Sequence, residues 1–255
     1  MVKQAVLITG ASSGIGLELA KLFAKRGFNL VLVSSNAQKL DDAKKLLGSC
    51  QGIVITIPKD LAIPGAARQL YQQVRNAGFS IDVLVNNAGF GIYGEFATQS
   101  LERNTELIHL NCTTLTQLTH LFLPEMLKNK TGKILNVASV AGFFPGYLMA
   151  SYYASKAYVL SFSQALGEEL RGTGVSVTTL CPGATATNFE KTAGAQTSRL
   201  FKGHIMTAQQ VAQEGYRGLM KNKKLIIPGL KNKFLVFIAR FLPRGIVVKK
   251  IQGKR

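Results

Sequence analysis

The chain has 255 residues, of which 47% are hydrophobic and 17% are charged. This length and composition suit one large α/β domain and exclude a disordered or collagen-like chain. Cys50, Cys112 and Cys181 are odd in number and widely spaced, so they predict neither a disulfide framework nor a metal cluster. We therefore expect a reducing compartment and no metal site.

Positive charge is concentrated near the C-terminus. The chain carries a net charge of +18, and Lys221 to Arg255 holds eleven Lys and Arg but no acid. Such an excess attracts polyanions such as nucleic acid, anionic lipid or phosphorylated ligands. No apolar run reaches the roughly 18 residues that a membrane span needs, and Ala5–Ile8 is too short for a secretory signal core. We expect a cytoplasmic protein, with membrane association as an open alternative.

Short β-branched runs alternate along the chain with longer segments of helical spacing, such as the one containing Leu107, Leu110, Leu115, Leu118 and Leu121. The predicted strands are Val6–Thr9, Leu30–Val33, Ile53–Ile57, Val83–Val85, Ile134–Val137, Val175–Leu180 and Leu225–Ile227. Apolar strands that alternate with helices predict a doubly wound, Rossmann-type α/β fold. We expect a single domain with a parallel seven-stranded sheet and helices on both faces.

The predicted domain covers residues 1–228, and a basic, apolar extension covers 229–255. Residues 185–206 lack a clear period and are rich in Thr, Ala, Gly and Ser. Long segments of this kind are commonly functional loops. We therefore predict a substrate lid there.

A glycine-rich turn follows the first predicted strand. Gly10, Gly14 and Gly16 lie between that strand and the first predicted helix. Glycine allows a tight turn and a close approach of the backbone to a pyrophosphate, and the helix N-terminus supplies free N–H groups. The context predicts a dinucleotide site, although a plain glycine-rich turn is the alternative.

The residues after the second predicted strand bear on cofactor choice. NAD sites place Asp or Glu there to bind the ribose 2′-hydroxyl, and NADP sites place a basic group near the 2′-phosphate. This chain has Ser34, Ser35 and Asn36, with Lys39 nearby. Because no carboxylate would repel a phosphate, NADP(H) is favoured and NAD(H) is the alternative.

Ser139, Tyr152 and Lys156 form the second motif. Ser139 ends the fifth predicted strand, and Tyr152 and Lys156 share a helix face at i and i+4. A nearby ammonium favours the phenolate, so we expect the pKa of Tyr152 to be lowered and Tyr152 to act as a general acid or base. Tyr153 is out of register with Lys156 and is the weaker candidate.

With these motifs the sequence resembles the short-chain dehydrogenase/reductase family along almost its whole length. The resemblance also covers Asp60-Leu61, the Asn86-Asn87-Ala88-Gly89 motif, Asn111, and Pro182-Gly183 with Thr187. It implies cofactor contacts from Gly10, Ser12, Ser13, Gly14, Ile15, Gly16, Ser34, Ser35, Asp60, Leu61, Asn87, Ala88, Gly89, Tyr152, Lys156, Pro182, Gly183, Thr185 and Thr187.

The resemblance also implies catalytic roles for four residues. Tyr152 would give a proton to a carbonyl oxygen as hydride arrives, and Lys156 would bind the nicotinamide ribose and depress the pKa of Tyr152. Ser139 would position the carbonyl, and Asn111 would hold a water that relays protons. The family pattern departs here only at Ser13 and at Ser34-Ser35, where NADP-preferring members often carry Arg or Lys.

Substrate contacts are expected from loops beyond the carboxyl ends of the strands. The segments Gly89–Gly94 and Gly142–Met149 are aromatic and aliphatic and contain no Lys or Arg. They favour an apolar, lipid-, steroid- or acyl-like carbonyl, although these side chains could instead only pack the loops. The candidate substrate residues are Ser139, Tyr152, Phe144, Tyr147 and Met149.

The C-terminal extension contains the apolar block Phe234–Leu242 between cations. Such a block is typical of a helix that lies in an anionic membrane surface, and packing on the protein's own core or on a partner subunit is the alternative. We expect a homodimer or homotetramer. An oxidoreductase is the leading function, and a non-catalytic cofactor-sensing or membrane-associated binding protein on the same fold is the alternative. Nucleic acid is not expected, because the charge lies in an apolar tail without a stacking array.

Overall fold

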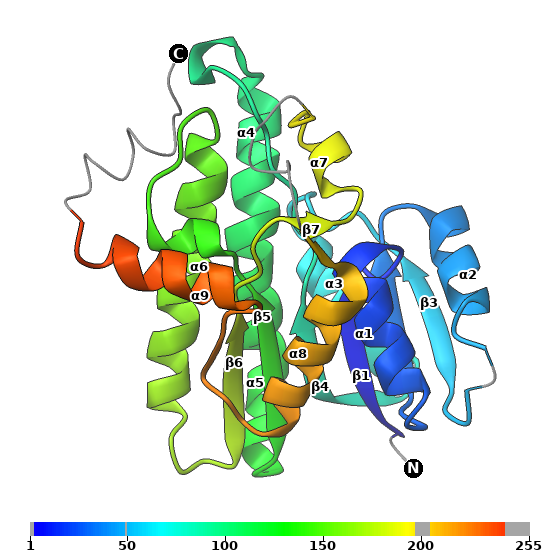
Figure 1. Ribbon diagram of the computed structural model, residues 1–255. Helices are drawn as coiled ribbons and strands as arrows, with labels where there is room; N and C mark the ends of the chain where they lie inside the picture. The colour runs from blue at the N-terminus through cyan, green and yellow to red at the C-terminus, as the bar shows by residue number, and fades with distance from the viewer. Residues whose placement is uncertain (1–2, 49, 197–204, 243–255) are drawn as a thin grey trace.

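The computed structural model describes residues 3–48, 50–196 and 205–242 (Figure 1). The strands are β1 (Lys3–Thr9), β2 (Leu30–Ser34), β3 (Val54–Pro58), β4 (Phe79–Asn86), β5 (Gly132–Val137), β6 (Val175–Leu180), β7 (Thr185–Ala186), β8 (Met206–Thr207) and β9 (Leu225–Ile226). The helices are α1 (Gly14–Ala24), α2 (Ala37–Lys45), α3 (Ala66–Asn76), α4 (Leu101–Ile108), α5 (Leu115–Lys128), α6 (Ala150–Glu169), α7 (Phe189–Thr192), α8 (Ala208–Met220) and α9 (Leu230–Ala239). Short 3₁₀ turns lie at Phe96–Thr98 and Val140–Phe143, and a π-helical turn lies at His109–Thr114.

Seven strands form one parallel sheet in the order β3-β2-β1-β4-β5-β6-β9. Each predicted strand is present, so the predicted doubly wound fold is confirmed. The chain moves outward in one direction from β1 to β3 and then returns to start the other half at β4. The resulting switch point between β1 and β4 is where open α/β sheets bind their ligands.

Helices cover both faces of this sheet (Figure 1). On one face, α1 and α8 pack together and bury residues such as Phe23 and Tyr216, whose rings meet edge to face at 4.9 Å. On the other face, α3 and α5 bury Leu70 and Phe122 against β1 and β4. Because both faces are covered, the strands are apolar without alternation, as the sequence pattern requires.

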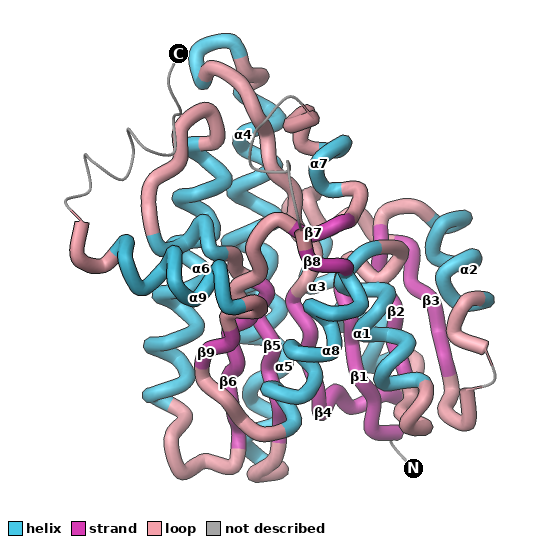
Figure 2. Tube along the Cα trace, in the orientation of Figure 1, coloured by secondary structure: helices cyan, strands magenta, loops and turns pink. Residues whose placement is uncertain are grey.

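The predicted lid is partly built of regular structure. β7 and β8 pair in parallel, with Thr185 opposite Met206 and Ala186 opposite Thr207, and Figure 2 shows them side by side. The short helix α7 lies between them in the sequence. The two ends of the predicted lid are therefore held together, and residues 197–204 of it lie outside the described residues.

The helical segment around Leu107–Leu121 is interrupted by the π-helical turn His109–Thr114, which lies between α4 and α5. Leu110 and Leu115 are five residues apart, one more than an α-helix allows for neighbours on a face. The wider turn accommodates this extra residue, and π-helical turns often occur at functional sites. Here it contains Asn111.

Gly229 is the last residue of the loop between β9 and α9, and its φ is +82°. Glycine adopts this left-handed conformation without the strain that a side chain would cause. α9 packs against the 3₁₀ turn Val140–Phe143. Within the described part of the chain, no helix has the length and apolar character required to cross a membrane.

Candidate active site

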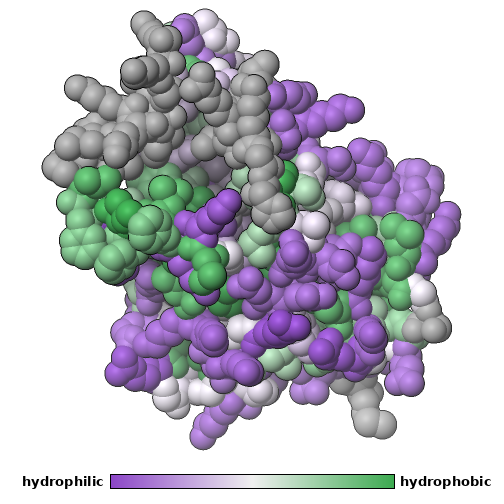
Figure 3. Space-filling view, viewed as in Figure 1, coloured by the Kyte–Doolittle hydropathy of each residue, from purple (hydrophilic) through white to green (hydrophobic). Residues whose placement is uncertain are grey.

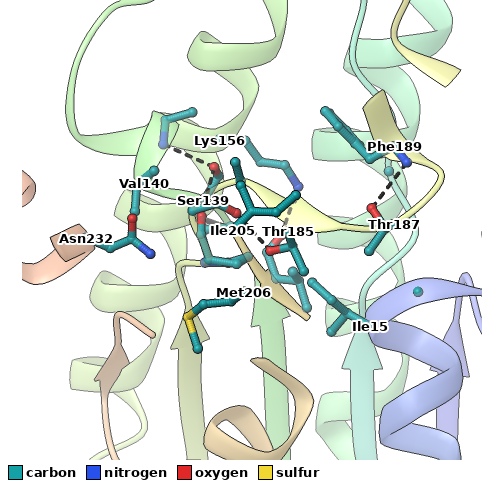
Figure 4. Close-up of a pocket in the computed structure, with 18 of the residues that line it drawn as sticks. Ile15, Ser139, Val140, Lys156, Thr185, Thr187, Phe189, Ile205, Met206 and Asn232 are labelled. Carbon is teal, nitrogen blue, oxygen red and sulfur yellow. Dashed lines mark hydrogen bonds between the residues drawn. The ribbon is translucent and has the colours of Figure 1, made fainter. Parts of the chain in front are cut away.

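The carboxyl ends of the strands and the start of α9 enclose a cavity of about 760 Å³ (Figure 4). This volume is in the usual range for small-molecule sites. Many predicted site residues line it together, although they are far apart in the sequence. They are Gly10, Ser12, Ser13, Gly14, Ile15, Asn87, Gly89, Ser139, Met149, Tyr152, Lys156, Pro182, Gly183, Thr185 and Thr187.

The remaining predicted residues lie outside this lining: Gly16, Ser34, Ser35, Asp60, Leu61, Ala88, Asn111, Phe144 and Tyr147. Gly16 has a packing role, because a Cβ there would lie 2.3 Å from the carbonyl oxygen of Gly10. Leu61 is buried, and its carbonyl oxygen accepts a hydrogen bond from Thr114. Asp60 accepts one from the backbone N–H of Ala62 at 2.9 Å.

The glycine-rich turn fits a phosphate group. Gly10 and Gly14 have φ values of +65° and +55°, which glycine adopts without strain. Ser13 occupies the N-cap of α1, but its side chain makes no capping hydrogen bond. The first-turn N–H groups of α1 are therefore not capped by this side chain, and they lie at the end of the helix that attracts anions.

Asn87 joins this turn to the end of β4. Its side-chain amide donates to the carbonyl oxygens of Thr9 and Gly10, at 2.9 and 3.2 Å. The Thr9 hydroxyl in turn accepts hydrogen bonds from the backbone N–H groups of Asn87 and Ala88, both at 3.0 Å. These bonds fix the two loops at the switch point relative to each other.

Ser34 is at the end of β2, where the residue that contacts the adenosine ribose of a dinucleotide usually lies. Its hydroxyl lies 2.8 Å from the hydroxyl of Ser12, so the end of β2 is hydrogen-bonded to the glycine-rich turn. Asn36 caps α2 by accepting a hydrogen bond from the backbone N–H of Lys39 at 2.8 Å. The first turn of α2 contains no acid, so nothing in that turn would repel a 2′-phosphate.

Tyr152 and Ser139 meet at the other end of the cavity. Burial raises the Tyr152 pKa above its ordinary value, and the smaller hydrogen-bonding effect of the Ser139 side chain opposes this shift. The spacing-based expectation of a lowered pKa is therefore not met in this structure. The raised pKa favours the neutral phenol, which is the form that gives a proton to a carbonyl oxygen.

Lys156 lies buried behind Tyr152. Its Nζ donates to the carbonyl oxygen of Val137 at 2.9 Å and is 5.8 Å from the centre of the Tyr152 ring. Burial lowers the Lys156 pKa to about 8, against a smaller opposing effect of the Cys112 and Cys181 thiols. Lys156 therefore titrates close to physiological pH, where a modest change in its surroundings changes its charge.

Asn111 supports the site from behind. Its side-chain amide donates to the Phe90 carbonyl oxygen and the Ser155 hydroxyl, both at 3.0 Å, and its carbonyl oxygen accepts from the Phe90 N–H at 3.2 Å. A Cβ on Gly89 would lie 2.8 Å from this Asn111 oxygen and 3.5 Å from Lys156 Nζ. Because Gly89 has no side chain, the space between Asn111 and Lys156 stays open. The predicted role of Asn111 in holding a proton-relaying water stays a prediction.

Several residues that line the cavity could not be identified from the sequence motifs. Leu230, Asn232 and Leu235 of α9 line the cavity, and Figure 4 labels Asn232 beside Val140. The Phe189 ring from α7 lies 5.1 Å from that of Tyr152. The Pro228-Gly229 sequence with Asn232 was the signal that could have predicted this part of the site. In the structure the Asn232 side-chain amide donates to the Pro228 carbonyl oxygen at 2.6 Å, and this hydrogen bond holds the start of α9 at the cavity.

The family profile described as short chain dehydrogenase matches residues 4–198. The chain belongs to the short-chain dehydrogenase family. Members of this family are NAD(P)(H)-dependent oxidoreductases, as the sequence motifs implied.

Two curated relatives show how far this similarity extends. The chain is 37% identical over 178 residues to ketoacyl reductase HetN from Nostoc sp., which covers 70% of this chain and 62% of the relative. It is 40% identical over 177 residues to a very-long-chain 3-oxoacyl-CoA reductase from Phaeosphaeria nodorum, covering 67% and 52%. The chain therefore spans between about half and two thirds of the length of these relatives.

Solved structures of short-chain dehydrogenases match over more of the chain. A short-chain dehydrogenase from Sphingobium yanoikuyae in complex with NADPH is 32% identical, has a TM-score of 0.83, and covers 100% of this chain and 97% of its own. A bulky-bulky ketone specific alcohol dehydrogenase from Comamonas testosteroni is 29% identical with a TM-score of 0.78, covering 100% and 95%.

Proposed function

We propose that this short-chain dehydrogenase interconverts an alcohol and a carbonyl on an apolar substrate, with NADP(H) favoured and NAD(H) as the alternative. The observation that carries the proposal is the position of the half-buried Tyr152, which lies beside Ser139 and has the Lys156 ammonium 5.8 Å from its ring centre. When bound, the nicotinamide would supply or accept the hydride. The residues of this chain supply the proton and the orientation.

Each side chain has a separate task in carbonyl reduction. Ser139 would donate a hydrogen bond to the substrate oxygen and so hold the carbonyl beside Tyr152. Tyr152 would then donate its proton to the same oxygen as negative charge develops there. Lys156 would stabilise the phenolate left behind, because a cation close by favours the ionised form in a site of low polarity.

Three observations support NADP(H). Ser34 stands where a carboxylate would bind the 2′-hydroxyl, and its hydroxyl bonds to Ser12. The similar structure from Sphingobium yanoikuyae is a complex with NADPH. The cavity also has no Asp or Glu among its described lining residues, which suits a ligand that carries phosphates.

The substrate end of the cavity supports an apolar carbonyl compound. Phe90, Met149, Phe189, Ile205 and Met206 are among the apolar residues that line the cavity. A very-long-chain 3-oxoacyl-CoA reductase and a bulky ketone alcohol dehydrogenase are among the similar proteins. Of the predicted substrate residues, Ser139, Met149 and Tyr152 are in the lining, whereas Phe144 and Tyr147 are not. The Phe144 ring lies 6.2 Å from the Tyr153 ring.

Replacing Tyr152 with Phe tests the proposed chemistry. We expect Tyr152→Phe to reduce ketone reduction by about 10²- to 10⁴-fold while binding of NADPH, followed by calorimetry, changes little. Tyr153→Phe is the matched control, because Tyr153 is adjacent and burial raises its pKa to about 12, but it lies out of register with Lys156. Normal turnover by Tyr152→Phe would refute the assignment of Tyr152 as the proton donor. Absence of turnover in the wild type, with NADPH still bound, would instead favour the cofactor-sensing binding protein.

Two partner predictions from the sequence remain proposals. One is assembly into a homodimer or homotetramer, which analytical ultracentrifugation tests. The other is contact between the C-terminal extension and an anionic membrane, for which α9 presents a specific surface.

A further inference from the structure

Helix α9 presents its large apolar side chains to the outside. Asn232, Val236 and Ala239 recur at i, i+4 and i+7 and form the face toward the protein, where Val236 is 4% exposed. On the opposite side, other residues recur at i, i+4, i+7, i+8 and i+11. This outer apolar stripe consists of Leu230, Phe234, Phe237, Ile238 and Phe241.

The outer apolar stripe is larger than scattered surface hydrophobic residues would explain. Its side chains are between 37% and 82% exposed, and the Phe237 and Phe241 rings contact each other at 5.1 Å. Figure 3 shows the patch as a continuous green area over α9. Single exposed apolar residues are ordinary, but a contiguous patch on a soluble domain marks an interaction surface.

Cations border this stripe on both sides. At about 100° per residue, Lys231 lies at one edge, and Lys233 and Arg240 lie at the other. All three are exposed, and α9 contains no acid. An apolar strip with cations at both edges is complementary to an anionic lipid surface, where acyl chains lie beneath charged headgroups.

A second copy of this chain is a poorer occupant of the stripe. A two-fold interface would place the same surface patch on both subunits. Lys231, Lys233 and Arg240 of one copy would then face the same cations of the other, with no acid in α9 to pair with them. Like charges brought together in this way oppose association.

The stripe is continuous with the substrate cavity. Leu230 belongs to the stripe and also lines the cavity, and Leu235 lines the cavity one residue after Phe234. The apolar surface therefore runs from the outer face of α9 into the proposed substrate site.

We propose that α9 lies in the surface of an anionic membrane with the outer apolar stripe inserted, and that the substrate enters the cavity from the lipid past Leu230 and Leu235. The ten residues of α9 are too few to span a bilayer, which needs about 20, so the helix lies in the interface. The entry route rests on the proposed oxidoreductase function, whereas the membrane contact does not.

Vesicle co-sedimentation of the full chain tests the contact without any turnover. We expect binding to vesicles of phosphatidylglycerol and phosphatidylcholine in equal parts, and little binding to phosphatidylcholine alone. The double variant Phe234→Ser/Phe237→Ser should bind roughly 10- to 100-fold more weakly, since two aromatic side chains are lost from the bilayer. Lys233→Gln/Arg240→Gln should cost about fivefold per cation, and salt should weaken binding.

The matched control replaces two apolar side chains of similar exposure elsewhere. Leu46 and Ile63 are 61% and 58% exposed, compared with 65% and 59% for Phe234 and Phe237. Leu46→Ser/Ile63→Ser should sediment like the wild type. Thermal melting of each variant verifies that the fold is retained. Equal loss in both double variants, or wild-type binding that ignores lipid charge, would overturn the proposal.

A fluorescent probe locates the inserted face. The chain contains no Trp, so Phe237→Trp gives a single reporter. Its emission should shift to the blue, and iodide should quench it less, when phosphatidylglycerol vesicles are added. Leu46→Trp should show neither change. A Phe237→Trp signal that responds to protein concentration instead of lipid would show that a second copy covers the stripe, and would refute the membrane assignment.

An activity measurement tests the entry route separately. Reduction of a long-chain ketone dissolved in phosphatidylglycerol vesicles should be slower for Phe234→Ser/Phe237→Ser, whereas reduction of a short, water-soluble ketone should be unchanged. If both proteins reduce the membrane ketone equally, the entry route is wrong. If neither ketone is reduced by the wild type, the proposed function fails, while the vesicle and fluorescence results still decide the contact.

Discussion

Lys156 is a charged group that the fold buries at a cost, and replacing it with Met measures that cost. Burial lowers its pKa from 10.5 to about 8, and a shift of this size corresponds to about 3 kcal/mol in favour of the neutral side chain. Met has a similar length and no charge. The substitution removes the penalty but leaves the Val137 carbonyl oxygen without the donor that lies 2.9 Å away, at a cost of about 1–2 kcal/mol.

The net expectation is that Lys156→Met increases the free energy of unfolding at neutral pH by roughly 1–2 kcal/mol. In a chain of this length that would raise Tm by about 2–4 °C per kcal/mol. Carbonyl reduction should be lost in the same variant, because Tyr152 loses the nearby cation. Active sites often contain groups that function requires although they lower the stability of the folded protein, and Lys156 would be such a group.

The pH dependence gives this prediction a specific signature. The folded pKa of about 8 lies below the unfolded value of 10.5, so folding favours the neutral lysine. Below the folded pKa both states are protonated, and the wild type bears the whole penalty. As pH rises from about 8 to 10.5, the folded lysine loses its proton first and the penalty fades. The stability difference between Lys156→Met and the wild type should shrink across this window.

Urea unfolding followed by circular dichroism, on cofactor-free protein at several pH values, measures this difference. Lys44→Met is the control, because Lys44 is exposed on α2 and its substitution should give no such pH dependence. A Lys156→Met protein that is less stable than the wild type at neutral pH would refute the argument. So would a stability difference that does not change with pH.

Two further predictions concern the cofactor and the proton. Ser34→Asp would place a carboxylate beside Ser12, whose hydroxyl now lies 2.8 Å from that of Ser34. The ratio of kcat/KM for NADPH to that for NADH should fall by about 10- to 100-fold. Ser34→Asn is the neutral control, and an unchanged ratio in Ser34→Asp would contradict the NADP(H) assignment. The kcat/KM for ketone reduction should be level below pH 8 and fall above it, because Lys156 loses its proton with a pKa of about 8 while the raised pKa of Tyr152 keeps the acid protonated. A profile that stays level through pH 10 would show that the charge of Lys156 is not needed.

The sheet could be predicted well from the sequence because its strands are buried on both faces. Each strand is then a short apolar run that differs clearly from its helical neighbours. The ends were harder to predict. β1 begins at Lys3 instead of Val6, because the backbones of Lys3 and Gln4 pair with Phe79 and Ser80. Backbone pairing of polar residues leaves no trace in the hydrophobic pattern.

Many of the predicted site residues line one cavity, but the electrostatics of the site could not be predicted from the sequence. The spacing of Tyr152 and Lys156 places them on one helix face, which the structure confirms through their 5.8 Å separation. Spacing gives no information on depth. Burial controls the pKa of both groups, and the Lys156 ammonium points to the Val137 carbonyl oxygen. A tertiary contact of this kind cannot be deduced from residue order.

The extension shows a similar limit. Its apolar residues and cations are visible in the sequence, but their orientation depends on how α9 meets the protein. Asn232 lies against Gly183, where an added Cβ would come within 2.4 Å of the Asn232 side chain. Only glycine allows this close approach. The contact fixes the face of α9 that is turned inward and thereby determines that the outer apolar stripe faces away.

The two ends of the cavity place complementary demands on a ligand. Among the described lining residues there is no Asp or Glu, while Lys156 and Lys231 both contribute. The positive potential of Lys156 is therefore not neutralised by a carboxylate in that lining, and it can act on anionic groups that enter or form there. A phosphate-bearing cofactor at the glycine-rich turn and a phenolate developing at Tyr152 both gain from this field. An apolar substrate of the proposed kind would gain nothing from this field, and would be bound instead by the apolar side chains that join the cavity to α9.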